Sequence, residues 1–214
     1  MANATPNGKL TAGAIGNFLL GGAAALFVLT LGAAMFGGAA PSATGAGILG
    51  LVVFILIIGG GITGSLGWFG LGSMHGGTNA LAGIFSIILA ITPILMIALV
   101  MGSAESMAKS GDFSHAESKA ASMGLVGTIL ALGVPALLGI FGGLGVMSAK
   151  SGLAKPAGLV MLLGGIGCAA LTVFALAGVG GPTLAMIALY VGFFGLAVGL
   201  ILSGAAMLGE RQKA

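Results

Sequence analysis

The sequence contains seven Lys or Arg, four Asp or Glu and two His among 214 residues, and all of them lie outside its long apolar runs. Charged and histidine side chains inside a membrane usually belong to proton relays, ion sites or catalytic centres, because their burial in hydrocarbon costs several kcal/mol. No such side chain stands within a long apolar run here. We therefore predict no catalytic residue, no enzymatic activity and no coupled ion transport within the bilayer.

The two histidines do not form a metal or haem site. His75 follows the second apolar run and His115 follows the third, so a six-span topology places them on opposite faces of the membrane. A transmembrane cytochrome needs histidine ligands within its helices, and none is found there. We interpret both residues as solvated loop side chains, and we predict no cofactor and no bound metal.

The sulfur-containing side chains are better explained by packing than by metal binding. The sequence has 11 methionines, and Met96, Met101 and Met107 come nearest to a cluster. Thioethers suit Cu(I), but methionines spread through apolar runs are typical of flexible core packing. The single cysteine, Cys168, is expected to be a small packing residue.

The one sizeable polar connection covers residues 103–121. Ser114 and Glu117 have the spacing of a capping box, which predicts that the fourth helix starts near His115 and projects beyond the membrane. The acidic residues of the segment are interpreted as solvated charge rather than as a surface cation site. They are Glu105, Asp112 and Glu117. We expect this segment to form a small external cap that meets a partner, with Ser114, His115 and Glu117 as candidate residues.

The composition, 58% apolar and 5% charged, predicts an all-α integral membrane protein rather than a soluble domain, which carries roughly 25% charge. Runs of about 20 apolar residues are long enough to cross the hydrocarbon core as helices. Six such runs make one membrane domain over residues 1–214. They are residues 13–36, 46–72, 80–102, 122–148, 157–181 and 183–208.

The basic residues are distributed unequally over the two sides of this topology. The side with both termini carries five of them, and the opposite side carries Lys109 and Lys119. The five are Lys9, Lys150, Lys155, Arg211 and Lys213. By the positive-inside rule both termini face the cytoplasm, and Trp68 is then expected to be an anchor at the cytoplasmic interface. Short loops and this charge bias favour a bacterial inner membrane.

Forty-three glycines indicate how the helices pack. The hydrophobic effect does not drive helices together in lipid, and small residues instead allow backbones to approach closely. Small residues recur at four-residue spacing in three of the runs, where we expect helix-packing faces. They are Gly60, Gly64, Gly139, Gly143, Gly195, Gly199 and Ser203. Hydroxyl groups are expected to add interhelical hydrogen bonds, from Thr30, Thr63, Thr128, Thr172 and Ser203.

Pro93 and Pro135 lie near the middle of the third and fourth spans. Proline removes one helical hydrogen bond and clashes with the preceding turn, so both helices are expected to be kinked. A paired kink is a candidate hinge or gate, although proline is also common in membrane helices for structural reasons. Three spans on either side of the polar segment also permit an inverted repeat, for which the sequence gives only thin support.

Two functions are compatible with these observations. The first is a non-catalytic membrane subunit that packs against other membrane chains, or against copies of itself, within the lipid bilayer. The second is a channel or facilitator for a small neutral or apolar solute, with hydroxyls such as Thr92, Thr128 and Ser86 in reach of it. Seven scattered basic residues make no surface for nucleic acid.

Overall fold

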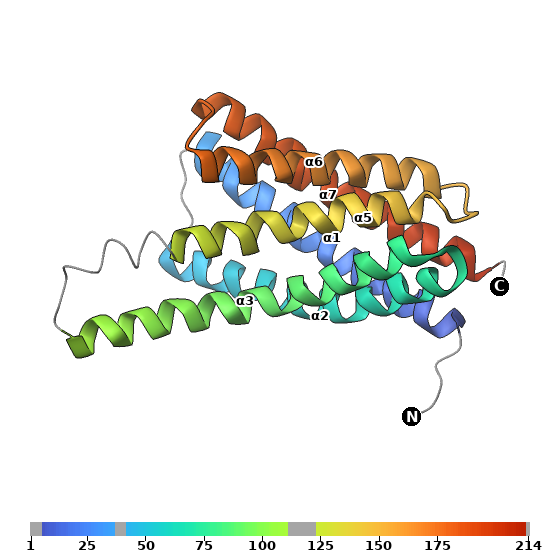
Figure 1. Cartoon of the computed structure of the whole chain (residues 1–214), viewed down its shortest axis with the longest axis horizontal. Helices are drawn as coiled ribbons and strands as arrows, with labels where there is room; N and C mark the ends of the chain where they lie inside the picture. The colour runs from blue at the N-terminus through green and yellow to red at the C-terminus, as the bar shows by residue number, and fades with distance from the viewer. Residues whose placement is uncertain (1–5, 37–41, 111–122, 213–214) are drawn as a thin grey trace.

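The computed structural model describes residues 6–36, 42–110 and 123–212, and this part of the chain is helical and contains no strand. Its helices (Figure 1) are α1 (Pro6–Phe36), α2 (Ala43–His75), α3 (Gly77–Ser110), the π-helical turn η1 (Ile129–Gly133), α5 (Val134–Val146), α6 (Ala154–Ala177) and α7 (Pro182–Arg211). Helical residues 123–128 lead directly into η1, so residues 123–146 form one span. Within the described ranges, six helices are long and apolar enough to cross a membrane, which confirms the predicted number of spans.

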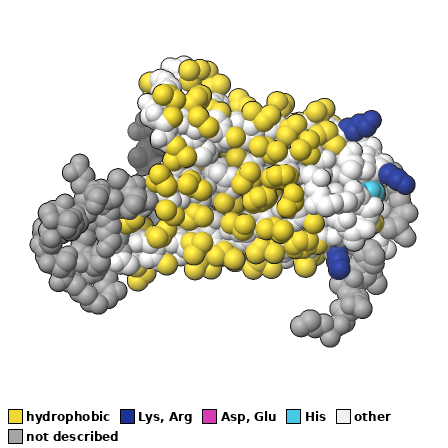
Figure 2. All heavy atoms as spheres, viewed as in Figure 1, with side chains coloured by type: hydrophobic (Ala, Val, Ile, Leu, Met, Phe, Trp, Pro, Cys, Tyr) yellow, Lys and Arg dark blue, Asp and Glu magenta, His cyan; other side chains and the backbone are white. Residues whose placement is uncertain are grey.

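The six spans form a ring. Each helix packs against the next one along the chain, and α7 packs against α1 to close the ring. The first residues of α1 and the last residues of α7 lie at the same end of the bundle (Figure 1). The Lys and Arg side chains visible in Figure 2 gather at that end, where Lys9, Lys150, Lys155 and Arg211 occur in the described chain. We refer to it as the basic end.

The helices are longer than the apolar runs that predicted them. α1 begins at Pro6 rather than at residue 13, and α3 continues to Ser110, which lies inside the predicted external segment. The second and third apolar runs leave residues 73–79 between them, which predicted a loop there. This prediction is wrong, because only Gly76 separates α2 from α3. Gly76 has φ +110°, a conformation that L side chains rarely adopt, so a single glycine reverses the chain.

Small residues bring the helix backbones close together. A Cβ added at Gly16 would lie 2.5 Å from the Cα of Gly64, and one added at Gly139 would lie 2.5 Å from the Cα of Gly165. Real side chains do not approach backbone atoms so closely, so α1 and α2, like α5 and α6, meet at distances that only glycine permits. Such approach increases van der Waals contact, which is a main attraction between helices in lipid.

Most of the hydroxyl groups expected to link helices bond within their own helix, which corrects that prediction. Thr63, Thr128 and Thr172 donate to the carbonyl four residues earlier, at 2.6, 2.8 and 2.8 Å. Thr30 bonds in the same way to Leu26. A hydroxyl in a helix always has such a carbonyl within reach, whereas an acceptor on a neighbour depends on register. An interhelical hydroxyl bond runs instead from Ser86 to the carbonyl of Gly61, at 3.0 Å.

Trp68 is not an interface anchor, and the prediction that it would be one is wrong. Its side chain is 0% exposed and belongs to the main core cluster. A glycine on the facing helix makes room for it, because a Cβ added at Gly142 would lie 3.3 Å from the tip of the indole ring. The residue thus fills the centre of the bundle, where the large ring makes more packing contacts than it would at the interface.

His75 was expected in a solvated loop, but it is the last residue of α2 and bonds to α7. Its Nε2 lies 3.2 Å from Oε2 of Glu210, and the two side chains are 13% and 7% exposed. The second carboxylate oxygen, Oε1, is buried without a hydrogen-bond partner. The pair therefore ties the ends of α2 and α7 together at the basic end.

Replacing His75 with alanine is expected to lower the free energy of unfolding by about 1.5–3 kcal/mol, the usual value of a hydrogen bond to a charged group. The substitution also leaves a nearly buried carboxylate with no partner. The measurement is equilibrium unfolding in mixed micelles, followed by the fluorescence of Trp68. The control is Arg211→Ala, an exposed neighbour of Glu210 that should change stability by less than about 0.5 kcal/mol. Equal effects of the two changes would show that the pair contributes nothing.

Candidate functional site

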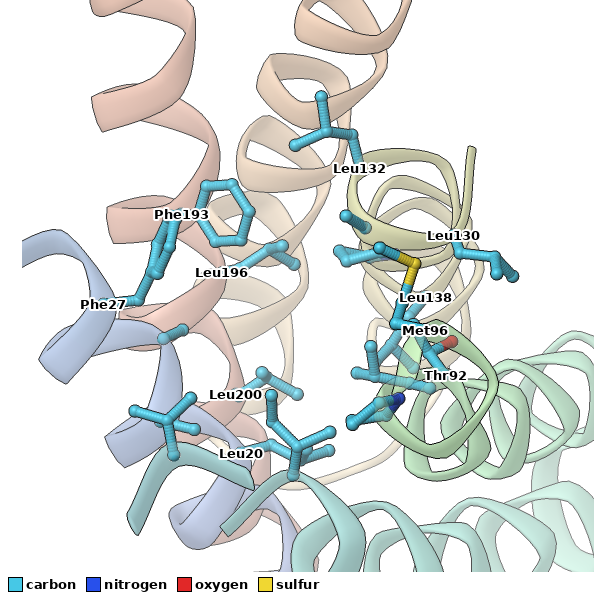
Figure 3. A pocket seen from close by; sticks show the side chains of 18 residues that line it. Leu20, Phe27, Thr92, Met96, Leu130, Leu132, Leu138, Phe193, Leu196 and Leu200 are labelled. Carbon is cyan, nitrogen blue, oxygen red and sulfur yellow. The ribbon is translucent and has the colours of Figure 1, made fainter. Parts of the chain in front are cut away.

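An apolar cavity of about 330 Å³ lies inside the ring of helices, and Figure 3 shows it from close by. Five of the six spans contribute to its wall: α1, α2, α3, the span containing η1 and α5, and α7. Phe27 and Phe193 lie on one side of the view, and Thr92, Met96 and Leu130 lie on the other. The wall thus joins residues that are up to 180 positions apart in the sequence, from Leu20 to Leu200.

The chemistry of the wall is almost wholly hydrocarbon. Among its 18 residues only Thr92 has a polar side chain. The Thr92 hydroxyl donates to the carbonyl of Ile88 in its own helix, at 2.9 Å. It therefore has no proton left to donate to a ligand. A space of this kind stays free of water and takes up apolar molecules, as a cavity of about 150 Å³ in a soluble core does.

A π-helical turn shapes one side of the cavity. The N–H of Val134 donates to the carbonyl of Ile129, five residues earlier, instead of to the residue four positions back. The next residue, Pro135, has no N–H, and in a regular helix its ring would press on the carbonyl of Ala131. The wider turn relieves that clash. It contains residues 130–132, all three of which line the cavity. Such turns are rare and often occur at functional sites.

Pro93 lines the cavity from α3, the helix that packs beside the span containing this turn. It is inside the uninterrupted helix α3, and it lines the cavity together with Leu89 and Met96. Pro93 cannot donate the bond that would reach the Leu89 carbonyl, so the backbone of α3 is weakened at the cavity. The structure thus brings the two predicted hinge candidates, Pro93 and Pro135, to one site.

Toward the basic end, beyond the wall residues Leu138 and Leu200, the core of the bundle is tightly packed. Trp68, Met161 and Met207 fill this part of the core, and each is 0% exposed. Asn17 donates to Sδ of Met207 at 3.7 Å. The Ser203 hydroxyl, which donates to the Gly199 carbonyl at 2.7 Å, also lies 3.5 Å from Sδ of Met161. We refer to this part of the core as the floor of the cavity.

The seven predicted helix-packing residues contact helices of the same chain. Gly60 and Gly64 face α1, with Gly64 also beside Ser86 of α3. The other small residues of this set lie between α5, α6 and α7, where they meet the backbones or side chains of neighbouring helices. These are Gly139, Gly143, Gly195, Gly199 and Ser203. The predicted external residues Ser114, His115 and Glu117 lie outside the described part of the chain.

Sequence reasoning identified the two prolines but not the cavity. The sequence also pointed to Thr92, which lines the cavity, as a hydroxyl within reach of a solute. The remaining wall residues are Leu, Ile, Val, Phe, Ala and Met, which are the ordinary residues of any membrane helix. No three His, Cys, Asp or Glu side chains gather as a metal site would need, within the residues that the structure describes.

These features define a class: a multi-pass helical membrane protein with a partly open apolar cavity between its helices. Comparison with protein-family models, with curated proteins and with solved structures found no match to the chain.

Proposed function

We propose that this protein is a membrane-embedded binding protein that holds a small, uncharged, apolar molecule or group in its central cavity. The observation that carries the proposal is the wall itself, in which 17 of 18 residues have no side-chain nitrogen or oxygen. A volume of about 330 Å³ is at the lower end of the range, roughly 300–1,000 Å³, in which proteins bind small molecules. Without an ion pair or a free donor, shape and dispersion contacts are the means of recognition.

An occupant of the cavity is favoured by packing energetics. Unfilled space in a soluble core costs about 24 cal/mol per Å³, because the atoms that line it lose van der Waals contacts. The core beneath the cavity is tightly packed, so open space is not a general feature of the packing in this bundle. An apolar ligand restores the missing contacts, so the bound state is the stable one.

Binding is favoured over conduction, which was part of the solute hypothesis drawn from the sequence. An apolar molecule dissolves in the hydrocarbon of the bilayer and needs no pore to cross it. The floor of Trp68, Met161 and Met207 also separates the cavity from the basic end. The weakened backbones at Pro93 and Pro135 then serve as hinges that adjust the cavity to its ligand.

The orientation of the bundle and its assembly with other chains are proposed from the sequence. The positive-inside rule supports a cytoplasmic location for the basic end, and a bacterial inner membrane stays a prediction. Packing in a larger assembly also stays a prediction. The seven small residues contact helices of this chain, and residues 111–122 of the external segment that was expected to meet a partner lie outside the described residues.

Filling the cavity is expected to abolish binding. In the variant Ala24→Phe, a wall residue of α1 gains a ring that occupies the space. The probe is a small phenyldiazirine added to proteoliposomes of the full chain, with light-induced adducts mapped by mass spectrometry. We expect saturable labelling of wall residues such as Leu196, and at least about a tenfold loss of it in the variant, equivalent to 1.4 kcal/mol or more.

The matched control is Gly22→Phe, two residues earlier in α1. A Cβ added at Gly22 meets no atom within 4 Å, and Gly22 does not line the cavity. This variant should label like the unmodified protein. Labelling of Leu196 that does not saturate, or that persists in Ala24→Phe, would contradict the proposed function.

A further inference from the structure

A second apolar space lies beside the central cavity. It is a groove of about 210 Å³ between α1 and α2, lined by Phe27, Thr30, Ala46, Leu49, Gly50 and Val53. Phe27 and Val53 also line the central cavity. These two side chains are therefore the boundary between the groove and the cavity, and no other layer separates them.

The groove begins where the close packing of α1 and α2 ends. Toward the basic end, Gly60 lies against Gly16 and Leu20, and a Cβ added there would lie 2.9 Å from their atoms. Further from the basic end, a Cβ added at Gly50, which lines the groove, would meet no atom within 4 Å. The two helices separate over this stretch, as Figure 1 shows for the half of the bundle away from the basic end.

The groove opens onto a surface that faces lipid. Leu29 of α1 and Ile48 and Leu51 of α2 flank it, and their side chains are 60–68% exposed. The only hydroxyl in the groove, that of Thr30, is bonded to carbonyls of its own helix. The whole path from the bilayer to the cavity therefore offers hydrocarbon contacts and no free hydrogen-bond donor.

We propose that the groove is a lateral entrance, through which the hydrocarbon chain of a membrane lipid passes Phe27 and Val53 and occupies the central cavity. This inference rests on the proposed function and names its ligand. A flexible chain fits two spaces that meet at a shared boundary, because it can occupy both at once, whereas a compact solute would fill one. Lipid chains are also the molecules already present at the mouth of the groove.

Phe27 is placed to control the passage. Its ring lies 4.9 Å from that of Phe193 on α7, at an interplanar angle of 50°, and Phe193 also lines the cavity. The Phe27 side chain is 40% exposed, so its outer side is open among the described residues and the ring has room to rotate. Rotation of this ring away from Phe193 widens the boundary, and the ring then packs against the entering chain.

The test uses the full chain in vesicles of phosphatidylcholine that carries a diazirine near the end of one acyl chain. After irradiation, adducts are located residue by residue on α5 and α7. Leu138 and Leu196 line the cavity and are 1% and 3% exposed. Leu137, next to Leu138, and Phe194, two residues before Leu196, are 39% and 61% exposed and serve as the surface reference. The ratio of cavity adducts to surface adducts measures entry of the chain.

Gly50→Leu places a side chain in the groove, where it meets no atom of the protein within 4 Å of its Cβ. The ratio is expected to fall at least about fivefold. Gly47→Leu, one turn earlier on α2 and outside the groove, should leave the ratio unchanged.

The possible results separate the two proposals. Cavity adducts that persist undiminished in Gly50→Leu would overturn the lateral entrance and leave the binding function intact. Labelling of the cavity by the phenyldiazirine but not by the lipid would overturn the lipid chain as the ligand. If neither probe labels the cavity, the binding function itself is wrong.

Discussion

The variant Gly16→Ala is expected to lose about 3 kcal/mol or more of its free energy of unfolding, although it adds a single methyl group. The Cβ of the new alanine would lie 2.5 Å from the Cα of Gly64 and 2.7 Å from the carbonyl oxygen of Gly60, and closer still to the backbone nitrogen of Gly64. All three obstacles belong to the backbone of α2, so no side chain can rotate away. The helices must separate, and overpacking of this kind costs at least 1–3 kcal/mol even where side chains can adjust.

The control for this change is Gly22→Ala, in the same helix. A Cβ at Gly22 meets no atom within 4 Å. Alanine there should be neutral or stabilising, because alanine is the better helix former by about 1 kcal/mol. Unfolding in mixed micelles, monitored by Trp68 fluorescence and by the alkylation rate of the buried Cys168, provides two independent readouts. Similar stabilities of the two variants would mean that α1 and α2 are not in backbone contact.

The sequence was sufficient for the number and type of elements because these follow from composition alone. Six apolar runs of membrane-spanning length became six helices, and their glycines became points of backbone approach. The sequence was not sufficient for contacts between spans, since these depend on the rotation of each helix about its axis. Gly13, Gly16 and Gly67 lie in the closest contact between α1 and α2, yet the four-residue spacing rule selected only Gly60 and Gly64 in that pair.

Residues near the ends of the apolar runs also form contacts between spans that the sequence did not predict. His75 and Trp68 were assigned to solvent and to the interface because each lies near the end of an apolar run. The helices extend beyond these runs, so His75 meets Glu210 across the bundle and Trp68 is surrounded by helices. A boundary inferred from hydropathy marks where apolar residues stop, and helical hydrogen bonds need no apolar side chain to continue.

The cavity is a departure from close packing, and for this reason no local pattern predicts it. Tight packing at the basic end and open packing beyond Gly60 use the same residue types. The difference arises from where the backbones of neighbouring helices come into contact. Pro93 and Pro135 affect these contacts, because each changes the course of a helix rather than the polarity of its surface.

Replacing Trp68 with alanine is expected to lower the free energy of unfolding by about 3–5 kcal/mol, as large-to-small changes of buried aromatic residues do. Trp68 is the largest side chain in the part of the core that is fully buried. Its removal takes away the centre of the floor, so the cavity should extend toward Met161. The small phenyldiazirine should then label Met161, which is 0% exposed and does not line the cavity in the unmodified protein. Cys168 alkylation measures the loss of stability, since the variant lacks the fluorescent reporter.

Trp68→Phe provides the matched comparison. It retains an aromatic ring in the floor and removes the indole Nε1–H, which is buried without a hydrogen-bond partner. Loss of an unsatisfied donor offsets part of the lost packing, so this variant should lose less than half as much stability as the alanine variant and should leave Met161 unlabelled. If Trp68→Ala were as stable as the unmodified protein, Trp68 would not be the floor of the cavity. The interface position expected from hydropathy would then be the better account of this residue.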